Sequence, residues 1–222
     1  VKGKMSKLFY ILLDGVGDRP DPSLNWVTPL EAAHTPCLNL LARRSVSGLV
    51  YPVGRRIAPE SDIAVFSMLG YDFHTAYIGR GVVEAVGVAH SFIDGELALR
   101  GNFATVGDDL TIIDRRAGRD LLECEARELT EEVNKGVDLS QGARFQLIPT
   151  VGHRNVLIIK MPETKLSPNI SNTDPAYERI GGMGVAKEPV KELKLQRSKP
   201  LDDNSISKLG SRLVNEFTEK AM

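Results

Sequence analysis

The sequence predicts an α/β protein in which an α+β module is inserted into a core that contains a parallel sheet. Two apolar segments of strand length, residues 8–13 and 46–53, alternate with helical signals, as in sheets that are covered on both faces. From about residue 79 the pattern changes to short strands separated by Asp-Gly and Gly-Asp turns, which indicate antiparallel hairpins. We therefore expect three parts: a first part of the core over residues 1–78, an inserted domain over 79–189 and a return to the core over 190–222.

Composition is typical of a globular protein that acts on small molecules. The 222 residues are 42% hydrophobic and 26% charged, with a formal net charge of −1. This balance gives no electrostatic argument for a nucleic-acid partner or an acidic membrane surface, and no apolar run reaches the roughly 18 residues of a membrane-spanning helix. Cys37 and Cys124 lack metal-ligand spacing, so we expect buried thiols, a reducing compartment and a cytoplasmic location.

The first predicted strand is followed directly by a carboxylate. Leu8–Leu13 is a continuous apolar run, and Asp14 and Gly15 come next. Open α/β sheets bind their ligands at the carboxyl ends of strands, which makes Asp14 a candidate ligand-binding group. An Asp before a Gly is also common in ordinary turns, and from position alone the two interpretations weigh about equally.

Helical start signals fill the segment between the two predicted strands. Thr28-Pro29-Leu30-Glu31 has the form of a capping box, with Pro29 at the first helical position. Thr35-Pro36 repeats the start signal, and the pattern predicts a helix that continues to Arg44. An arginine at that end suits the negative pole of the helix dipole.

Ser61 is the candidate nucleophile. Glu60 ends a loop, a short apolar helix begins at Ser61 or Asp62, and Gly70 ends it. Free N–H groups and the positive pole of the dipole gather at such a position, which favours phosphate binding. Taken alone, the stretch is more typical of an N-cap serine. If the sheet is parallel, Asp14 and Ser61 emerge at the same edge, and this strengthens the case for an active site.

The inserted part is predicted to consist mainly of hairpins and helices. The expected elements, in order, are a short helix from about residue 79, hairpins over 91–100, 103–113 and 144–160, a helix over 120–133, irregular chain over 166–199 and an amphipathic final helix over 202–222.

Turns of this part carry a basic cluster beside carboxylates. The candidates are Asp114, Arg115, Arg116, Arg119, His153 and Arg154. Arginine suits bidentate recognition of phosphate and carboxylate. For any single arginine here, a solvated charged turn is the alternative.

Seven motifs, in chain order, together resemble the archaeal-type 2,3-bisphosphoglycerate-independent phosphoglycerate mutases of the alkaline phosphatase superfamily. The resemblance extends from residue 7 to about residue 220. The motifs are Asp14–Arg19, Thr28–Ala33, Pro59–Asp62, Leu69–Asp72, Arg100–Val106, Asp114–Arg119 and Leu166–Pro175.

The resemblance implies an isomerase of glycolysis and gluconeogenesis that interconverts 3-phosphoglycerate and 2-phosphoglycerate without added 2,3-bisphosphoglycerate. It implies an alkaline-phosphatase-like core sheet with helices on both faces, and Ser61 as the residue that carries the phosphoryl group as phosphoserine. Two divalent ions (manganese, magnesium or zinc) would bind there, with Asp14 and Ser61 among their ligands, because hard oxygen donors suit such ions. The basic cluster would hold the glycerate.

Members of that family are longer than this chain, which therefore resembles their N-terminal half and contains an incomplete core. Most metal ligands would lie in the other half of the family's chain. That half would be a partner of this chain if it is a separate polypeptide. The chain could also form a homo-oligomer. Two alternatives to the mutase follow. One is another enzyme of the superfamily, such as a phosphatase or a phosphonopyruvate-decarboxylase-like protein. The other is a non-catalytic fragment that lacks the second-half ligands.

Overall fold

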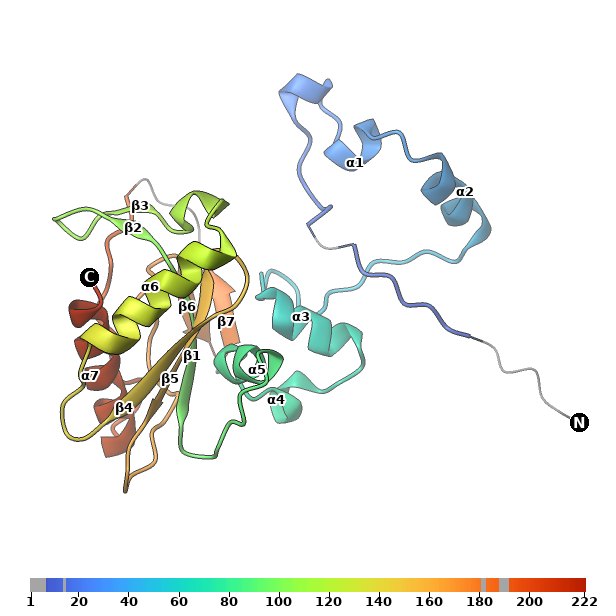
Figure 1. Cartoon of the computed structure of the whole chain (residues 1–222). Coiled ribbons are helices and arrows are strands. Elements are labelled where there is room, and N and C mark those ends of the chain that lie inside the picture. The colour runs from blue at the N-terminus through green and yellow to red at the C-terminus, as the bar shows by residue number, and fades with distance from the viewer. Residues whose placement is uncertain (1–6, 14, 181–182, 188–191) are drawn as a thin grey trace, which may run out of the picture. The chain divides into compact units, whose positions relative to one another are not determined.

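The computed structural model describes residues 7–13, 15–180, 183–187 and 192–222, and its contacts divide the chain into two units, residues 1–50 and 51–222 (Figure 1). The described elements make a mixed α/β protein. The domain boundaries predicted at residues 78/79 and 189/190 divide the chain differently and stay predictions, as does the alkaline-phosphatase-like core.

Local signals determine the helices of the first unit. It contains η1 (Pro22–Leu24), α1 (Pro29–Ala32) and α2 (Pro36–Arg44). The capping box is confirmed, because the Thr28 hydroxyl accepts the Glu31 N–H at 3.2 Å and the Glu31 carboxylate accepts the Thr28 N–H at 2.8 Å. The predicted helix to Arg44 is also confirmed.

The two strands predicted for the core are wrong in this structure. Residues 8–13 and 46–53 are not assigned as strands, and Leu8 and Val46 are fully or almost fully exposed. A strand forms only when a neighbour completes its hydrogen-bond ladder, and no described strand pairs with either segment. Apolar composition alone therefore did not decide the local structure.

The second unit is built on a three-stranded sheet with the order β1-β5-β4. Its strands are β1 (Leu97–Asn102), β4 (Arg144–Pro149) and β5 (Arg154–Lys160), all paired antiparallel. The β4–β5 hairpin confirms the one predicted around Gly152. The hairpin predicted around Gly95 is wrong: β1 pairs with β5 instead, and the Glu96 carboxylate accepts the Ile93 N–H at 3.1 Å in a tight turn.

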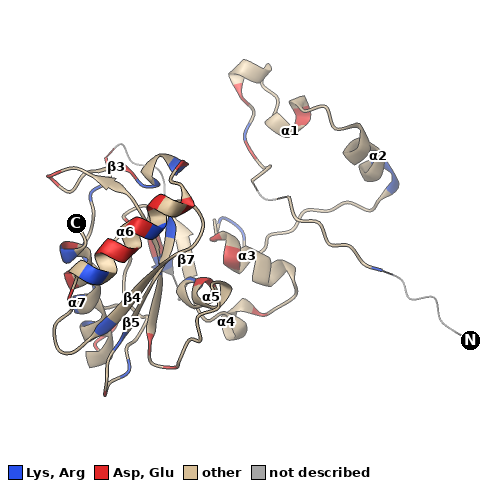
Figure 2. Cartoon of the chain, viewed as in Figure 1, with Lys and Arg blue, Asp and Glu red and all other residues tan. Residues whose placement is uncertain are grey.

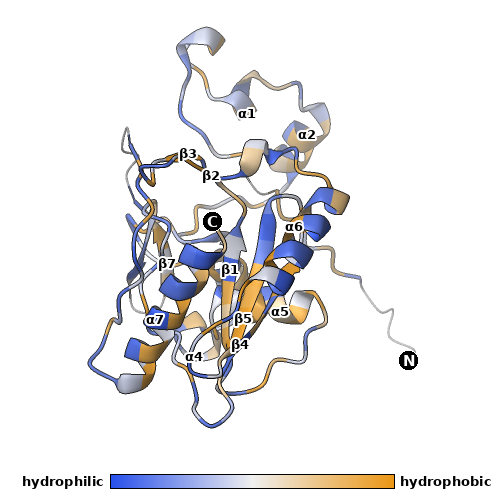
Figure 3. Ribbon diagram, turned by 60° about the vertical axis from the view of Figure 1, so that its left-hand side comes forward, coloured by the Kyte–Doolittle hydropathy of each residue, from blue (hydrophilic) through white to orange (hydrophobic). Residues whose placement is uncertain are grey.

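Alternation along β5 separates two apolar layers, since successive side chains point to opposite faces. Leu157 and Ile159 belong to the larger core with α7 (Ser205–Lys220), whereas Val156 and Ile158 pack with α5 (Arg80–Gly87). The hydrophobic strands lie between these helices in Figure 3. The predicted amphipathic final helix is confirmed, with Leu209, Leu213, Val214 and Phe217 buried.

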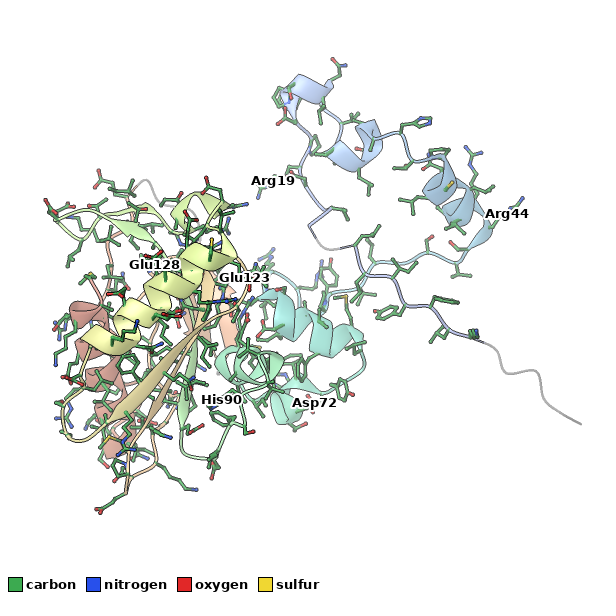
Figure 4. The ribbon with its side chains drawn as sticks, in the orientation of Figure 1. Arg19, Arg44, Asp72, His90, Glu123 and Glu128 are labelled. Atoms are coloured by element: carbon green, nitrogen blue, oxygen red, sulfur yellow. The ribbon has the colours of Figure 1, made fainter. Side chains whose placement is uncertain are left out.

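Helix α6 (Glu123–Gly136) covers the edge strand β4 and confirms the helix predicted over 120–133. Its Asn134 side chain accepts the Leu147 N–H and donates to the Leu147 carbonyl, both at 2.8 Å. These bonds occupy backbone groups that an open edge would leave free. The outer face of α6 carries exposed acidic side chains, including Glu123 and Glu128 (Figure 2, Figure 4).

Two small hairpins, two α-helices and a 3-10 helix are the other described elements of the unit. The hairpin of β2 (Thr105–Val106) and β3 (Ile112–Asp114) confirms a prediction, whereas β6 (Tyr177–Ile180) and β7 (Met183–Ala186) pair within a segment that was predicted to be irregular. The remaining elements are α3 (Ser61–Met68), α4 (Phe73–Ala76) and η2 (Ala117–Arg119).

The expectation of buried thiols is wrong, since Cys37 and Cys124 are both exposed and free. Cys124 lies on α6 two residues before the buried Ala126, and residues two apart on a helix face different sides. Within the ranges that the structure describes, no helix is both long and apolar enough to cross a membrane.

Candidate functional site

Ser61 is the first helical residue of α3 and is exposed. The predicted helix, which begins at Ser61 and stops before Gly70, is confirmed; Gly70 has a φ of +87°. Glu60 occupies the N-cap position, so the alternative in which Ser61 is only the N-cap does not describe this helix. The Ser61 side chain is therefore at a helix N-terminus, where an anion is stabilised.

The loop that leads to Ser61 is attached to the edge of β7. The Glu60 N–H donates to the Gly184 carbonyl at 3.2 Å, and the Ala186 N–H donates to the Ala58 carbonyl at 3.4 Å. Gly184 leaves room for the Glu60 side chain, because a Cβ there would lie 2.3 Å from Glu60 Oε2. The hairpin that sequence analysis missed thus holds the candidate nucleophile's loop.

A group of basic side chains gathers at one end of the sheet. Burial lowers the pKa of His153, and the nearby charges of Arg154, Arg100 and Arg119 lower it further, while Asp114 opposes them. His153 is therefore neutral at neutral pH. The structure brings together four of the predicted residues (Asp114, Arg119, His153 and Arg154) and adds Arg100, which sequence analysis did not single out as a site residue.

Arg100 is an unusual side chain for its position on β1. Burial lowers its pKa, and the positive charges of Arg80 and Arg154 act in the same direction. Its Nε is buried without a hydrogen-bond partner among the described residues, as are Asn102 Oδ1 and Thr150 Oγ1. Such groups are rare in folded proteins unless something else binds them, and these three lie at the end of the sheet where Asn102 pairs with Arg154.

Two other predicted residues have structural partners. Both Asp114 oxygens accept backbone N–H groups of the following turn, from Arg116 at 2.8 Å and from Gly118 at 2.9 Å. The Arg115 guanidinium donates to Asp174, at 2.5 Å from Nη2, and stacks over Tyr177 at 5.1 Å. Arg116 is half-buried in the same turn. Substrate contacts of these three residues stay predictions.

Glu60, Arg100 and Arg115, all described above, line a cavity of about 410 Å³. Polar groups on its wall include Glu60, Arg80, Arg100 and Arg179, and Leu99 contributes to the apolar part. A mostly apolar cavity with a few convergent polar groups is the usual form of a small-molecule site.

Sequence analysis missed Arg80 and Arg100, and the only local feature that they share in the sequence is an adjacent glycine. In the structure a Cβ on Gly81 would lie 1.9 Å from the Ala98 backbone carbonyl oxygen, and one on Gly101 would lie 2.2 Å from the Asn155 side-chain oxygen Oδ1. A glycine that packs closely against a neighbouring segment fixes the backbone of the adjacent arginine, and so fixes where its charged side chain begins.

The metal centre implied by the resemblance is not formed by the described residues. Asp14 lies outside the described residues, and within them no group of three or more His, Cys, Asp or Glu side chains could hold an ion. Ser61 alone does not make a metal site.

The fold and the site define a mixed α/β protein with a positively charged cavity beside an exposed helix N-terminus. Comparison with known proteins makes this specific. A family model described as 2,3-bisphosphoglycerate-independent phosphoglycerate mutase matches residues 42–222. The chain belongs to this family, and the resemblance drawn from the seven motifs is confirmed.

Relatives of the same description cover almost the whole chain. It is 44% identical to a mutase of Aeropyrum pernix over 97% of its length and 50% of the relative's, and 37% identical to one of Methanopyrus kandleri over 100% and 49%. A solved cofactor-independent phosphoglycerate mutase of Thermoplasma acidophilum has a TM-score of 0.51 and 34% identity, over 95% of this chain and 50% of that one. The chain spans about half the length of these relatives.

Proposed function

We propose that the protein interconverts 3-phosphoglycerate and 2-phosphoglycerate, without 2,3-bisphosphoglycerate, by way of a phosphoryl group on Ser61. The observation that carries this proposal is the position of Ser61. It is the exposed first residue of α3, and its neighbour Glu60 lines the same cavity as Arg100. Membership of the mutase family supports the choice of substrate.

The proposed reaction has two symmetrical transfers. The Ser61 oxygen bonds to phosphorus, the bond from phosphorus to the glycerate oxygen breaks, and the serine proton is lost while the glycerate oxygen gains one. The other glycerate hydroxyl then attacks phosphoserine, and the Ser61 hydroxyl is restored. The N–H groups at the start of α3 stabilise the phosphoryl oxygens in both transfers.

Between the transfers the glycerate must stay bound and reorient. Its carboxylate would be held by the basic end of the sheet, where Arg100 lines the cavity and Arg119 and Arg154 are further candidates. Water that reached phosphoserine would release inorganic phosphate, so the site must exclude it. The need to retain an alcohol explains why a cavity rich in arginine accompanies the nucleophile.

Two divalent ions remain part of the proposal, with Asp14 and Ser61 as the ligands that this sequence contributes. Manganese, magnesium and zinc are the candidates. Such ions would stabilise charge on the attacking and leaving oxygens. Incubation with a chelator, followed by return of each ion in turn, tests the requirement: activity that survives chelation would remove the ions from the proposal.

The deciding experiment measures isomerisation of 3-phosphoglycerate by the protein at its natural length. Ser61→Ala should lose at least about 1,000-fold in kcat, because the covalent route needs this oxygen. Ser205→Ala is the matched control, since Ser205 is also the exposed first residue of a helix, and it should retain activity. Full activity in Ser61→Ala contradicts the proposal, and phosphate release without isomerisation would favour a phosphatase.

A further inference from the structure

The residues on either side of Ser61 are both largely buried carboxylates. The Glu60 and Asp62 side chains are only 15% and 10% exposed, whereas Asp and Glu are almost never buried without a partner. Burial raises the pKa of Glu60, and the charge of Arg80 opposes that rise. Burying two carboxylates costs free energy, and an eight-residue helix does not need them for its own stability. Their position beside the exposed Ser61 therefore suggests a role in holding that residue.

One guanidinium, that of Arg80, is shared by both carboxylates. Its Nη1 lies 3.7 Å from Glu60 Oε1 and 3.6 Å from Asp62 Oδ1, and its Nε lies 3.5 Å from an oxygen of Glu84. The Arg80 side chain is 18% exposed. Because one cation interacts with the residue before Ser61 and with the residue after it, the backbone of Ser61 is restrained from both sides.

Arg80 is itself held in place by its backbone. It is the first residue of α5, and Gly79 before it has a φ of +98°, which favours glycine. Gly81 after it lies so close to β1 that a Cβ would meet the Ala98 carbonyl oxygen at 1.9 Å. The charge that holds the Ser61 loop therefore comes from a helix fixed against the sheet.

A second contact completes the arrangement around Asp62. The Tyr77 hydroxyl donates to Asp62 Oδ2 at 2.5 Å, and burial, together with this bond, raises the pKa of Tyr77. Tyr77 is therefore protonated and a donor throughout the physiological pH range. Asp62 Oδ1 thus faces the Arg80 charge in an ion pair without a hydrogen bond, while Asp62 Oδ2 accepts the hydrogen bond of the Tyr77 phenol.

We propose that Arg80 is a positioning residue that fixes Ser61 through Glu60 and Asp62, and so aligns the serine oxygen with a phosphoryl group in the cavity. The inference rests on the proposed function for its catalytic part. Arg80 acts through the two carboxylates and does not hold the substrate. Its loss should therefore reduce kcat and leave KM almost unchanged, because small misplacements of a reacting group lower the rate strongly.

The test compares Arg80→Ala and Arg80→Lys in the isomerisation assay at natural length. We expect kcat to fall about 10- to 100-fold in Arg80→Ala, with KM within about 3-fold of wild type, and a smaller loss in Arg80→Lys, which keeps the charge but not the fork. Arg127→Ala is the control, since Arg127 makes an exposed ion pair with Glu123. A rise in KM at unchanged kcat, or no change in either, would overturn the inference.

A second measurement is independent of activity. Hydrogen exchange of the amides of residues 60–65 should become faster in Arg80→Ala, while exchange in α6 stays the same. If the wild-type protein did not isomerise phosphoglycerate, the proposed function would fail, but hydrogen exchange would still test whether Arg80 restrains Ser61 through Glu60 and Asp62. Unchanged exchange at residues 60–65 would reject it even in an active enzyme.

Discussion

The interior of the three-stranded sheet and the end of the same strands differ sharply in packing and in hydrogen bonding. Inside, β5 directs Leu157 and Ile159 into one apolar layer and Val156 and Ile158 into the other, and the backbone pairs in register. At the end, arginines gather, and the Arg100 Nε is buried without a partner among the described residues. The interior therefore provides stability, whereas the end contains buried polar groups that cost stability, as is common at functional sites.

Removal of an interior side chain should have the largest effect on stability. Leu213 is 1% exposed in the core between α7 and the sheet, so Leu213→Ala should lower the free energy of unfolding by about 2–5 kcal/mol. Urea unfolding measures this. Leu201→Ala, at a side chain that is 48% exposed, is the control. An equal loss in both variants would mean that burial does not distinguish the interior.

Arg100 provides the complementary test at the end of the sheet. Arg100→Ala should raise KM for phosphoglycerate about 10- to 100-fold, since a hydrogen bond to a charged group contributes about 1.5–3 kcal/mol. The free energy of unfolding should change little, because burial already disfavours this cation. Arg144→Ala is the matched control: Arg144 pairs with Lys160 at the opposite end of the sheet. Equal KM values in the two variants would show that Arg100 does not contribute to substrate binding.

A helix cap should contribute less than the core that it serves. The Asn204 side chain accepts the Ile206 N–H at 3.2 Å at the start of α7. Asn204→Ala should lower the free energy of unfolding by about 1 kcal/mol, with KM unchanged. Asp203→Ala, one residue earlier and fully exposed, should change it less. The reverse order would show that the cap is not Asn204.

The smallest effect is a pH-dependent one at Glu60. Burial raises its pKa in the folded state above the ordinary value of 4.5, so the unfolded chain loses this proton first as the pH rises. Ionisation of Glu60 therefore lowers stability above about pH 4.5. Glu60→Gln should unfold at higher urea concentration than wild type at pH 7, and the difference should vanish below pH 4.

A control and a contrast accompany that measurement. Glu178→Gln, at an exposed carboxylate, should show no such pH dependence. Glu60→Gln should nevertheless lower kcat, because it removes one of the two carboxylates through which Arg80 acts. Destabilisation of Glu60→Gln at pH 7 would contradict the view that the buried charge of Glu60 costs stability.

Elements with local determinants could be predicted from the sequence, and those that depend on distant partners could not. The capping box at Thr28, the turn at Gly152 and the apolar face of α7 carry their information within a few residues. The apolar run at residues 8–13 reads as a strand, but its structure depends on a neighbour that no described residue supplies. The β6–β7 hairpin was missed because its segment lacks regular alternation.

The same division applies to the site. Ser61 could be recognised because a helix start is a local signal, and the turns near Arg119 and His153 could be recognised by their charge. Arg80 and Arg100 were missed because their roles arise from contacts with α3 and β5, which lie far away in the sequence. Asp14 lies outside the described residues, and its role as a metal ligand stays a prediction.

The most direct test of the account is to find the phosphoryl group. The protein at its natural length would be mixed with 3-phosphoglycerate, quenched in acid within milliseconds and digested, and the peptides would be analysed by mass spectrometry. We expect one added phosphoryl group on Ser61 in wild type and in Ser205→Ala, and none in Ser61→Ala. Isomerisation with no phosphoryl group on Ser61, or with the group on another residue, would contradict it.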